Sequence, residues 1–527
     1  MRRRLTGLAH AALLTTSLLL VAVPAVAAAA RAAAPSVAWL AAAGDADIDK
    51  AFAQARSEKK PMLLYWGAKW CPPCNQLKAT LFNRQDFIER SKSFVAVNID
   101  GDLPGAQKLG ARFKVRGYPT MILMTADGTE LTRLPGEADA PQVMAMLQRG
   151  LAGGRPVKAV LADAQAGKTL ASNEWRALAL YSWDTDQDQL VPEAERPGLL
   201  AQLSAACPAG EAESATRLLL KSLAASDDGK GIKADAALRE RVRKLLADPA
   251  ASRAQMEMLV NYSADISKAL APEPGAERQA VARDFEAALK RLEPDASLSR
   301  SDRLSALLAR VDLARLDLAK DERHPKLDAA LLKAVREHVA RADKEITDGY
   351  ERQAVITAAA YMLGQAGLWA ESDALLKANL AKSHSPYYLM NQLGSNARKL
   401  GRKDEALRWY QQAFDKSEGP ATRLQWGATY FSALVELAPQ DVARIEKTAT
   451  QLFSEAAQDQ GAFYERSARS LQRVGSKLVS WNSGGQHAAT LERLHKQVDG
   501  VCGKLDAADG QRPTCEALAK SLARPKA

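Results

Sequence analysis

Short apolar runs alternate with amphipathic stretches between residues 45 and 151. Three of these runs are too short for helices and rich in strand-forming residues: MLLYW (62–66), FVAVNI (94–99) and TMILMT (120–125). A turn at ADGT (126–129) leads into a further predicted strand at 130–134. Helical patterns fill the intervals at residues 45–60, 71–90, 103–113 and 141–151. Strands alternating with helices predict an α/β domain over residues 45–151.

The pattern changes after GLAGGRP (residues 150–156), a segment rich in glycine and ending in proline. Beyond it the apolar positions recur with helical periodicity to the end of the chain, and strand patterns are almost lacking. Many alanines and few β-branched runs favour helix over the same length. The sequence therefore predicts an all-α domain over residues 157–527, following the α/β domain.

A repeat occurs inside this helical region. AGLWAESDALLKANL (366–380) aligns without gaps on LGRKDEALRWYQQAF (400–414) at an offset of 34 residues. Small and aromatic residues of the second copy stand where tetratricopeptide repeats have them: Gly394, Ala406, Tyr410 and Ala413. Residues 353–418 thus resemble the tetratricopeptide family, which implies a solenoid of helix pairs. Generic packing of alanine-rich helices is the alternative.

The N-terminus has the three parts of a secretory signal. Three arginines at positions 2–4 precede an apolar stretch at 8–23, and Ala25-Val26-Ala27 forms an A-x-A cleavage site. We predict a signal peptide at residues 1–27 and a periplasmic mature protein with no membrane partner. An uncleaved membrane anchor is the alternative, because residues 11–30 are nearly long enough to cross a bilayer. Pro24 favours cleavage.

The charge balance is mildly basic. The chain has 72 Lys and Arg against 62 Asp and Glu, a formal charge of +10 that falls to +7 without the signal. No basic stripe is interleaved with aromatic residues, so we do not expect nucleic acid as a partner.

The segment YWGAKWCPPCNQL (65–77) contains the candidate chemistry. Its C-x-x-C motif follows a predicted strand and opens a predicted helix, whose N-terminal N–H groups and dipole stabilise a thiolate. Cys71 is then predicted to be the exposed nucleophile, and Cys74 the shielded thiol that attacks a mixed disulfide at Cys71. A structural disulfide is the alternative. A zinc site is not expected, since there is one C-x-x-C and no histidine near it, so we predict neither metal nor cofactor.

Three motifs together carry a second resemblance: WCPPC, VNIDGD (97–102) and VRGYPT (115–120). They resemble the thioredoxin superfamily over residues 45–151. The resemblance implies that Pro119 is a cis-proline lying against the sulfurs, where it presents backbone to a substrate. It also implies that Trp70, Tyr118 and Gly136 line the same substrate groove.

Two departures from that family bear on its activity. Thioredoxins proper carry a buried aspartate and a lysine where this chain has Tyr65 and Ala96, so Cys74 lacks its usual proton acceptor. Another carboxylate or a water is needed, which favours a dedicated partner. No histidine stands between the cysteines, and Pro73 offers no N–H to the sulfur. These features favour a moderately reducing dithiol.

Two further features lie in the helical region. DTDQDQLVPEAE (184–195) has acidic residues in a calcium-loop pattern, but Gln189 replaces the required glycine, which favours an acidic interhelix loop. Cys502 and Cys515 are predicted to form a structural disulfide in an oxidising compartment. Cys207 is then a buried free thiol, or it pairs with one of the terminal cysteines.

The sequence as a whole predicts an exported thiol–disulfide oxidoreductase. Its expected substrates are disulfides of periplasmic proteins, a separate redox partner restores the dithiol, and the helical region is available to bind a protein ligand. One alternative is a protein-binding scaffold or chaperone with an accessory dithiol. Another is an oxidase or isomerase of exported proteins.

Overall fold

The computed structural model describes residues 36–135, 140–183, 186, 189–226 and 230–523. The predicted signal peptide and its alternative, the membrane anchor, lie outside these residues. Residues Ser36–Ala527 form one compact unit. Among the helices of the described residues, none combines the length and the apolar character that crossing a bilayer requires.

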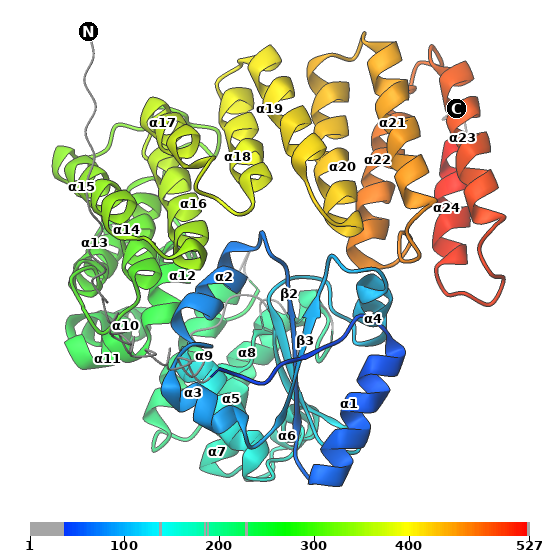
Figure 1. The fold of residues 1–527 in the computed structure, drawn as a ribbon. Helices are drawn as coiled ribbons and strands as arrows, with labels where there is room; N and C mark the ends of the chain where they lie inside the picture. Colours follow the sequence, from blue (N-terminus) through cyan, green and yellow to red (C-terminus); the bar gives the residue numbers. More distant parts are fainter. Residues whose placement is uncertain (1–35, 136–139, 184–185, 187–188, 227–229, 524–527) are drawn as a thin grey trace, which may run out of the picture. The chain divides into compact units, whose positions relative to one another are not determined.

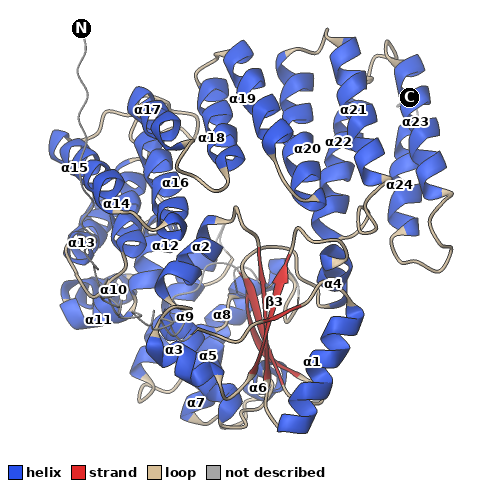
Figure 2. Cartoon of the chain, in the orientation of Figure 1, coloured by secondary structure: helices blue, strands red, loops and turns tan. Residues whose placement is uncertain are grey.

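A five-stranded sheet forms the centre of the N-terminal part (Figure 2). Its strands are Leu40–Ala41 (β1), Met62–Gly67 (β2), Val95–Asp100 (β3), Thr120–Met124 (β4) and Glu130–Pro135 (β5). They lie in the order β1-β3-β2-β4-β5. The first three are parallel, whereas β4 is antiparallel to both β2 and β5. The helices of this part are Asp45–Glu58 (α1), Pro72–Thr80 (α2), Gln85–Ser91 (α3), Ala106–Arg112 (α4) and Ala140–Leu151 (α5).

Strand β2 is buried along its whole length because helices cover both faces of the sheet. Leu63 and Tyr65 point into one hydrophobic cluster, with side chains of α2, α3 and α5. Met62, Leu64 and Trp66 alternate into the other cluster, with side chains of α1 and α4. The uninterrupted apolar run of this segment follows from burial on both faces. The predicted α/β fold is confirmed.

The single helix predicted over residues 71–90 is wrong, since the chain forms two helices there. Helix α2 ends at Thr80, and α3 begins at Gln85 after an extended Arg84. Phe82 and Phe87 are both buried, with ring centroids 5.3 Å apart. A continuous helix would direct residues five positions apart to different faces, so the break lets both rings enter the same core.

The rest of the described chain is helical (Figure 1). Its first half contains Val157–Gln165 (α6), Ser172–Leu180 (α7), a 3-10 turn at Glu193–Glu195, Arg196–Ala206 (α8), Ala212–Ala225 (α9), Ala236–Ala247 (α10), Pro249–Ala254 (α11), Met256–Leu270 (α12), Ala276–Leu292 (α13) and Arg300–Ala314 (α14). Its second half contains Ala329–Glu345 (α15), Gly349–Gln365 (α16), Trp369–Asn379 (α17), Pro386–Lys399 (α18), Lys403–Lys416 (α19), Pro420–Leu437 (α20), Val442–Ala456 (α21), Glu465–Trp481 (α22), Ala488–Cys502 (α23) and Arg512–Ala523 (α24). The predicted all-α region is confirmed.

The two aligned segments, 366–380 and 400–414, contain α17 and most of α19, each of which follows a partner helix, α16 or α18. Helices α18 and α19 pack closely on one another (Figure 1). A Cβ atom on Gly394 would lie 2.9 Å from the Tyr410 ring, so glycine is what permits this approach. The assignment to the tetratricopeptide family, and the limits of the domains, remain predictions.

The remaining sequence features take structural positions. A disulfide joins Cys502 of α23 to Cys515 of α24, with Cα atoms 5.6 Å apart. Cys207 ends α8 as a buried thiol, and burial raises its pKa to about 11. In the acidic segment, Asp186 accepts hydrogen bonds from the backbone N–H groups of Leu190 and Val191, at 2.9 and 3.3 Å. Within the described residues, no three or more His, Cys, Asp or Glu side chains gather as a metal site.

Candidate active site at the Cys71–Cys74 pair

Cys71 and Cys74 form a disulfide at the N-terminus of α2, with Cα atoms 5.3 Å apart. Cys71 is the N-cap residue, and its sulfur accepts a hydrogen bond from the Cys74 backbone N–H at 3.2 Å. Asn75 braces the turn, since its amide donates to the carbonyl oxygens of Lys69 and Cys71 at 2.9 and 2.8 Å. The same N–H and the positive end of the helix dipole would stabilise a Cys71 thiolate after reduction.

The predicted exposure of Cys71 is wrong for this structure. The residue is 2% exposed, and Cys74 is fully buried. Both pack with Ala68, Trp70 and Tyr118 in a small apolar cluster. In this arrangement a large substrate cannot reach the sulfurs without movement of the residues around them.

Trp70, the residue before Cys71, is one of the side chains that cover the two sulfurs. Its ring stacks on Tyr388 of α18, with centroids 5.9 Å apart, and meets Trp426 of α20 edge-on at 5.8 Å. Its indole N–H donates to Asp102 Oδ2 at 3.0 Å and to Thr422 Oγ1 at 2.8 Å. Helices from the C-terminal part of the chain therefore occupy the face of the domain on which Trp70 lies.

Arg466 at the start of α22 links this face to the loop after β3. Its guanidinium forms an ion pair with Asp102, and both side chains are almost buried, at 11% and 12% exposure. It also lies over the rings of Trp70 and Tyr118, 5.3 and 5.1 Å from their centroids. Its backbone N–H donates to Gln107 Oε1 at 3.0 Å. Asp102 belongs to the VNIDGD motif, but nothing in the sequence marks Arg466 as its partner.

Helix α2 is held on its other side by helices α14 and α16 and by the loop before α18. Ser301 donates to Gln76 Oε1 at 2.8 Å, and Gln353 Nε2 donates to the Trp70 carbonyl oxygen at 3.3 Å. A ring nitrogen of His384 lies 3.0 Å from the Lys69 carbonyl oxygen. The segment around the dithiol is thus fixed from two sides by one helical region.

The structure describes three of the four residues predicted to line the substrate groove, Trp70, Tyr118 and Pro119. The Tyr118–Pro119 peptide bond is cis, in agreement with the implication of the resemblance. The Tyr118 hydroxyl accepts a hydrogen bond from Gln107 Nε2 at 2.8 Å, and its ring fills the space that a Cβ on Gly101 would need. This contact explains the glycine of the VNIDGD motif. Gly136 lies outside the described residues, and the role of all four residues as a substrate groove remains a prediction.

Tyr65 and Ala96, which stand where thioredoxins proper carry the aspartate and the lysine, are packed in a hydrophobic cluster. The Tyr65 ring packs against Phe82 and Trp39, and its hydroxyl has no hydrogen-bond partner among the described residues. Burial raises the pKa of Tyr65 well above its usual value. Asp100, at the end of β3, is a half-buried carboxyl whose pKa burial also raises, while Lys78 of α2 acts in the opposite direction.

We expect Asp100→Asn to raise the free energy of unfolding at pH 7. A carboxyl whose pKa is higher in the folded than in the unfolded chain stabilises the fold below the unfolded pKa, and this stabilisation is lost as the pH rises through the folded pKa. Ionised Asp100 therefore costs stability at pH 7, and asparagine does not. The gain should shrink on acidification toward pH 4, as measured by urea unfolding.

Asp86→Asn is the opposite-sign control. Hydrogen bonds from Arg84 lower the pKa of Asp86, so its ionised form stabilises the fold and the substitution should cost stability at pH 7. Equal and pH-independent effects of the two substitutions would contradict the assignment for Asp100.

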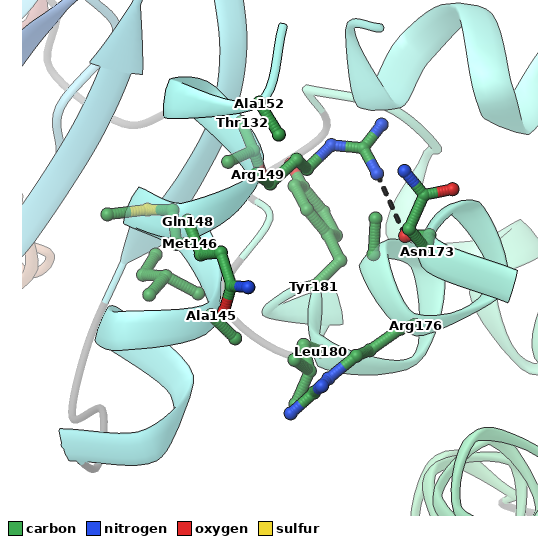
Figure 3. A pocket seen from close by; sticks show the side chains of 12 residues that line it. Thr132, Ala145, Met146, Gln148, Arg149, Ala152, Asn173, Arg176, Leu180 and Tyr181 are labelled. Atoms are coloured by element: carbon green, nitrogen blue, oxygen red, sulfur yellow. Dashed lines mark hydrogen bonds between the residues drawn. The ribbon is translucent and has the colours of Figure 1, made fainter. Parts of the chain in front are cut away.

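A cavity lies away from the sulfurs, between β5, α5 and α7 (Figure 3). Its volume is about 190 Å³, and its described lining includes neither cysteine nor any residue of α2. Arg149 of α5 crosses it and donates to the carbonyl oxygen of Asn173 at 3.0 Å (Figure 3). This cavity therefore lies at the contact between α5 and α7 and is separate from the dithiol site.

Comparison with known proteins yields matches to the N-terminal part. A family described as thioredoxin-like domain matches residues 48–151. The chain is 33% identical over 108 residues to a thiol:disulfide interchange protein DsbD of Pseudomonas fluorescens, which covers 20% of this chain and 18% of that protein. It is 30% identical over 115 residues to thiol:disulfide interchange protein DsbD 2 of Pseudomonas aeruginosa, which covers 21% and 20%. The chain thus spans a fifth or less of the curated relatives it matches.

Solved structures give a weaker match. Thioredoxin O2 from Arabidopsis thaliana in the oxidised state is 18% identical, with a TM-score of 0.19, and the match covers 21% of this chain and 94% of that one. The N-terminal part is a thioredoxin-like α/β domain, and the rest of the described chain is all-helical.

Proposed function

We propose that this protein is an exported thiol–disulfide oxidoreductase that reduces disulfides of other proteins through Cys71 and Cys74. The observation that carries the proposal is the disulfide at the N-terminus of α2, in which the Cys74 N–H points at the Cys71 sulfur. The match to thioredoxin-like domains and to two proteins named thiol:disulfide interchange proteins supports it.

The proposed reaction begins with the reduced protein. The Cys71 thiolate attacks one sulfur of a substrate disulfide, which forms a mixed disulfide and releases a substrate thiolate that takes up a proton. Cys74 loses its proton and attacks the Cys71 sulfur, which closes the Cys71–Cys74 disulfide and releases the second substrate thiol. The substrate gains two electrons and two protons. A separate dithiol protein then reduces the pair again by the same exchange.

The proposal also includes the compartment in which the protein acts and the role of its helical region. The predicted signal peptide and the Cys502–Cys515 disulfide support a periplasmic site, because such bridges persist in oxidising compartments. The helical region would bind the protein partner, with tetratricopeptide-like repeats around residues 353–418. Substrates, partner and direction belong to the proposal.

The decisive experiment measures insulin-disulfide reduction and the potential of the Cys71–Cys74 pair against glutathione. We expect Cys71→Ser to abolish turnover and Cys207→Ser to leave it unchanged, because Cys207 is a buried thiol outside the site. Turnover that survives Cys71→Ser would refute the proposal. A potential near thioredoxin's, about −270 mV, supports a reductase, whereas one near −120 mV supports an oxidase.

The burial of both cysteines favours a second candidate, a protein-binding scaffold with an accessory dithiol. In that case the helical region captures its partner without thiol exchange. Capture of the same partners by wild-type protein and by Cys71→Ser would support the scaffold. Loss of covalent and non-covalent capture together in Cys71→Ser would support the oxidoreductase.

A further inference from the structure

A cavity of about 480 Å³ lies against the two prolines between the cysteines. Pro72, Pro73 and Gln76 of α2 form one wall. Residues of α12, α14, α16, α18 and α20 form the others, among them Thr357 and Tyr361 (α16), Tyr388, Asn391 and Gln392 (α18), and Trp426 (α20). The volume is within the range of about 300–1,000 Å³ that is usual for ligand sites.

Three of the residues that line this cavity carry a polar atom without a protein partner, and each of these atoms is itself buried. Trp426 is 6% exposed, and its indole N–H has no hydrogen-bond partner in the described part of the chain. The same holds for the side-chain oxygens of Asn391 and Gln392. The Gln392 amide nitrogen donates to the Thr357 carbonyl at 3.1 Å, which fixes the direction of the side chain. One donor and two acceptors are therefore unmatched, which is costly for buried polar groups, and a ligand pairs with them only when the lining side chains move apart.

The charge of the lining residues also excludes some classes of ligand. All of the described lining residues are uncharged. A ligand with carboxylates, phosphates or ammonium groups would lose hydration there without a counter-charge. Tyr361, Tyr388 and Trp426 supply aromatic surface for apolar groups. A neutral ligand with both carbonyl and N–H groups fits this combination.

We propose that this cavity binds an extended, uncharged polypeptide segment next to the cysteine of the substrate protein. A peptide group offers one acceptor and one donor, which complement the Trp426 N–H and the oxygens of Asn391 and Gln392. The position beside Pro72 and Pro73 places the segment next to the turn that carries the dithiol, and the residues that cover the sulfurs must move before exchange takes place. The redox part of this assignment rests on the proposed function, whereas the binding itself does not. Glutathione, which is charged at both ends, is excluded as the preferred substrate.

The test uses the full chain with both Cys71→Ser and Cys74→Ser, so that no thiol exchange takes place. The probe is an uncharged hexapeptide with blocked ends and serine in place of cysteine, and binding is measured by calorimetry. A second peptide with two glutamates serves for comparison. We expect the neutral peptide to bind at least tenfold more tightly than the acidic one.

Two substitutions test the contacts. Trp426→Phe removes the N–H and keeps an aromatic ring, and we expect about a five- to tenfold loss of affinity, equal to one hydrogen bond. Asn391→Asp adds a carboxylate of the same size, and we expect the preference to shift toward peptides with a lysine. Trp481→Phe is the matched control, because the Trp481 indole donates to the Pro439 carbonyl oxygen in another part of the chain.

The outcomes separate this inference from the proposed function. Equal binding of the neutral and the acidic peptide, or no effect of both substitutions, would overturn it even if insulin is reduced. Glutathione that competes for the site with the peptide's affinity would overturn it too. Peptide binding that depends on Trp426 would support it even if the dithiol proved inactive.

Discussion

Arg466→Met is expected to accelerate the alkylation of reduced Cys71 by about 100-fold or more. The substitution removes one partner of the almost buried Arg466–Asp102 ion pair and leaves the Asp102 charge between Trp70 and Thr422. Removing one partner of a buried pair costs about 3–5 kcal/mol, and each 1.4 kcal/mol corresponds to a factor of ten. Because Arg466 also lies over Trp70 and Tyr118, this loss weakens the contacts that cover the sulfurs.

The measurement is the rate of iodoacetamide labelling of Cys71 in reduced protein, followed by mass spectrometry. Arg493→Met is the control, since Arg493 forms an exposed ion pair with Glu446 within the helical region. Cys207 reports on global unfolding, because it is buried elsewhere. Equal acceleration at Cys207, or an unchanged rate at Cys71, would contradict the role given to Arg466.

Gly105→Ala is expected to lower the free energy of unfolding by about 2–5 kcal/mol. Gly105 is the N-cap residue of α4 with φ = 86°, a conformation that costs other residues about 1–2 kcal/mol. A Cβ there would also overlap the carbonyl oxygen of Ala43, and such crowding costs about 1–3 kcal/mol more. Because α4 carries Gln107, which contacts both Tyr118 and Arg466, labelling of Cys71 should become faster as well.

Gly401→Ala is the matched control for this substitution. Gly401 has a φ of 74°, and nothing among the described residues lies within 4 Å of the added carbon. We expect a loss of about 1–2 kcal/mol and no change in Cys71 labelling. Urea unfolding and hydrogen exchange across Ala106–Arg112 measure the effects. Equal losses for the two variants would show that the backbone conformation accounts for the whole cost.

The sequence was sufficient for features that depend on neighbouring residues. MLLYW is apolar at every position because β2 is covered on both faces, so its assignment as a buried strand required no tertiary information. The position of Cys71 at the start of α2 followed from the strand before it and the helical pattern after it. The break between α2 and α3 escaped prediction, since it depends on burying Phe82 and Phe87 in one core.

Contacts between distant segments could not be predicted in this way. Arg466 lies 364 positions from Asp102 and looks in sequence like any surface arginine of an amphipathic helix. Trp426 and Tyr388 have the spacing of ordinary core residues, although they contact Trp70. The expectation of an exposed Cys71 failed for the same reason. The accessibility of the sulfurs depends on how the helical region, including α16, α18, α20 and α22, packs on the domain.

The contacts around Trp70 have a consequence for any molecule that is to reach the dithiol. The helices that cover this face belong to the same chain, so they compete with every incoming molecule at a fixed and high effective concentration. An incoming protein gains access only in the fraction of molecules that have opened, and its apparent affinity is reduced by that fraction. A ligand that holds the helices apart would therefore act as an activator of thiol exchange without touching either sulfur.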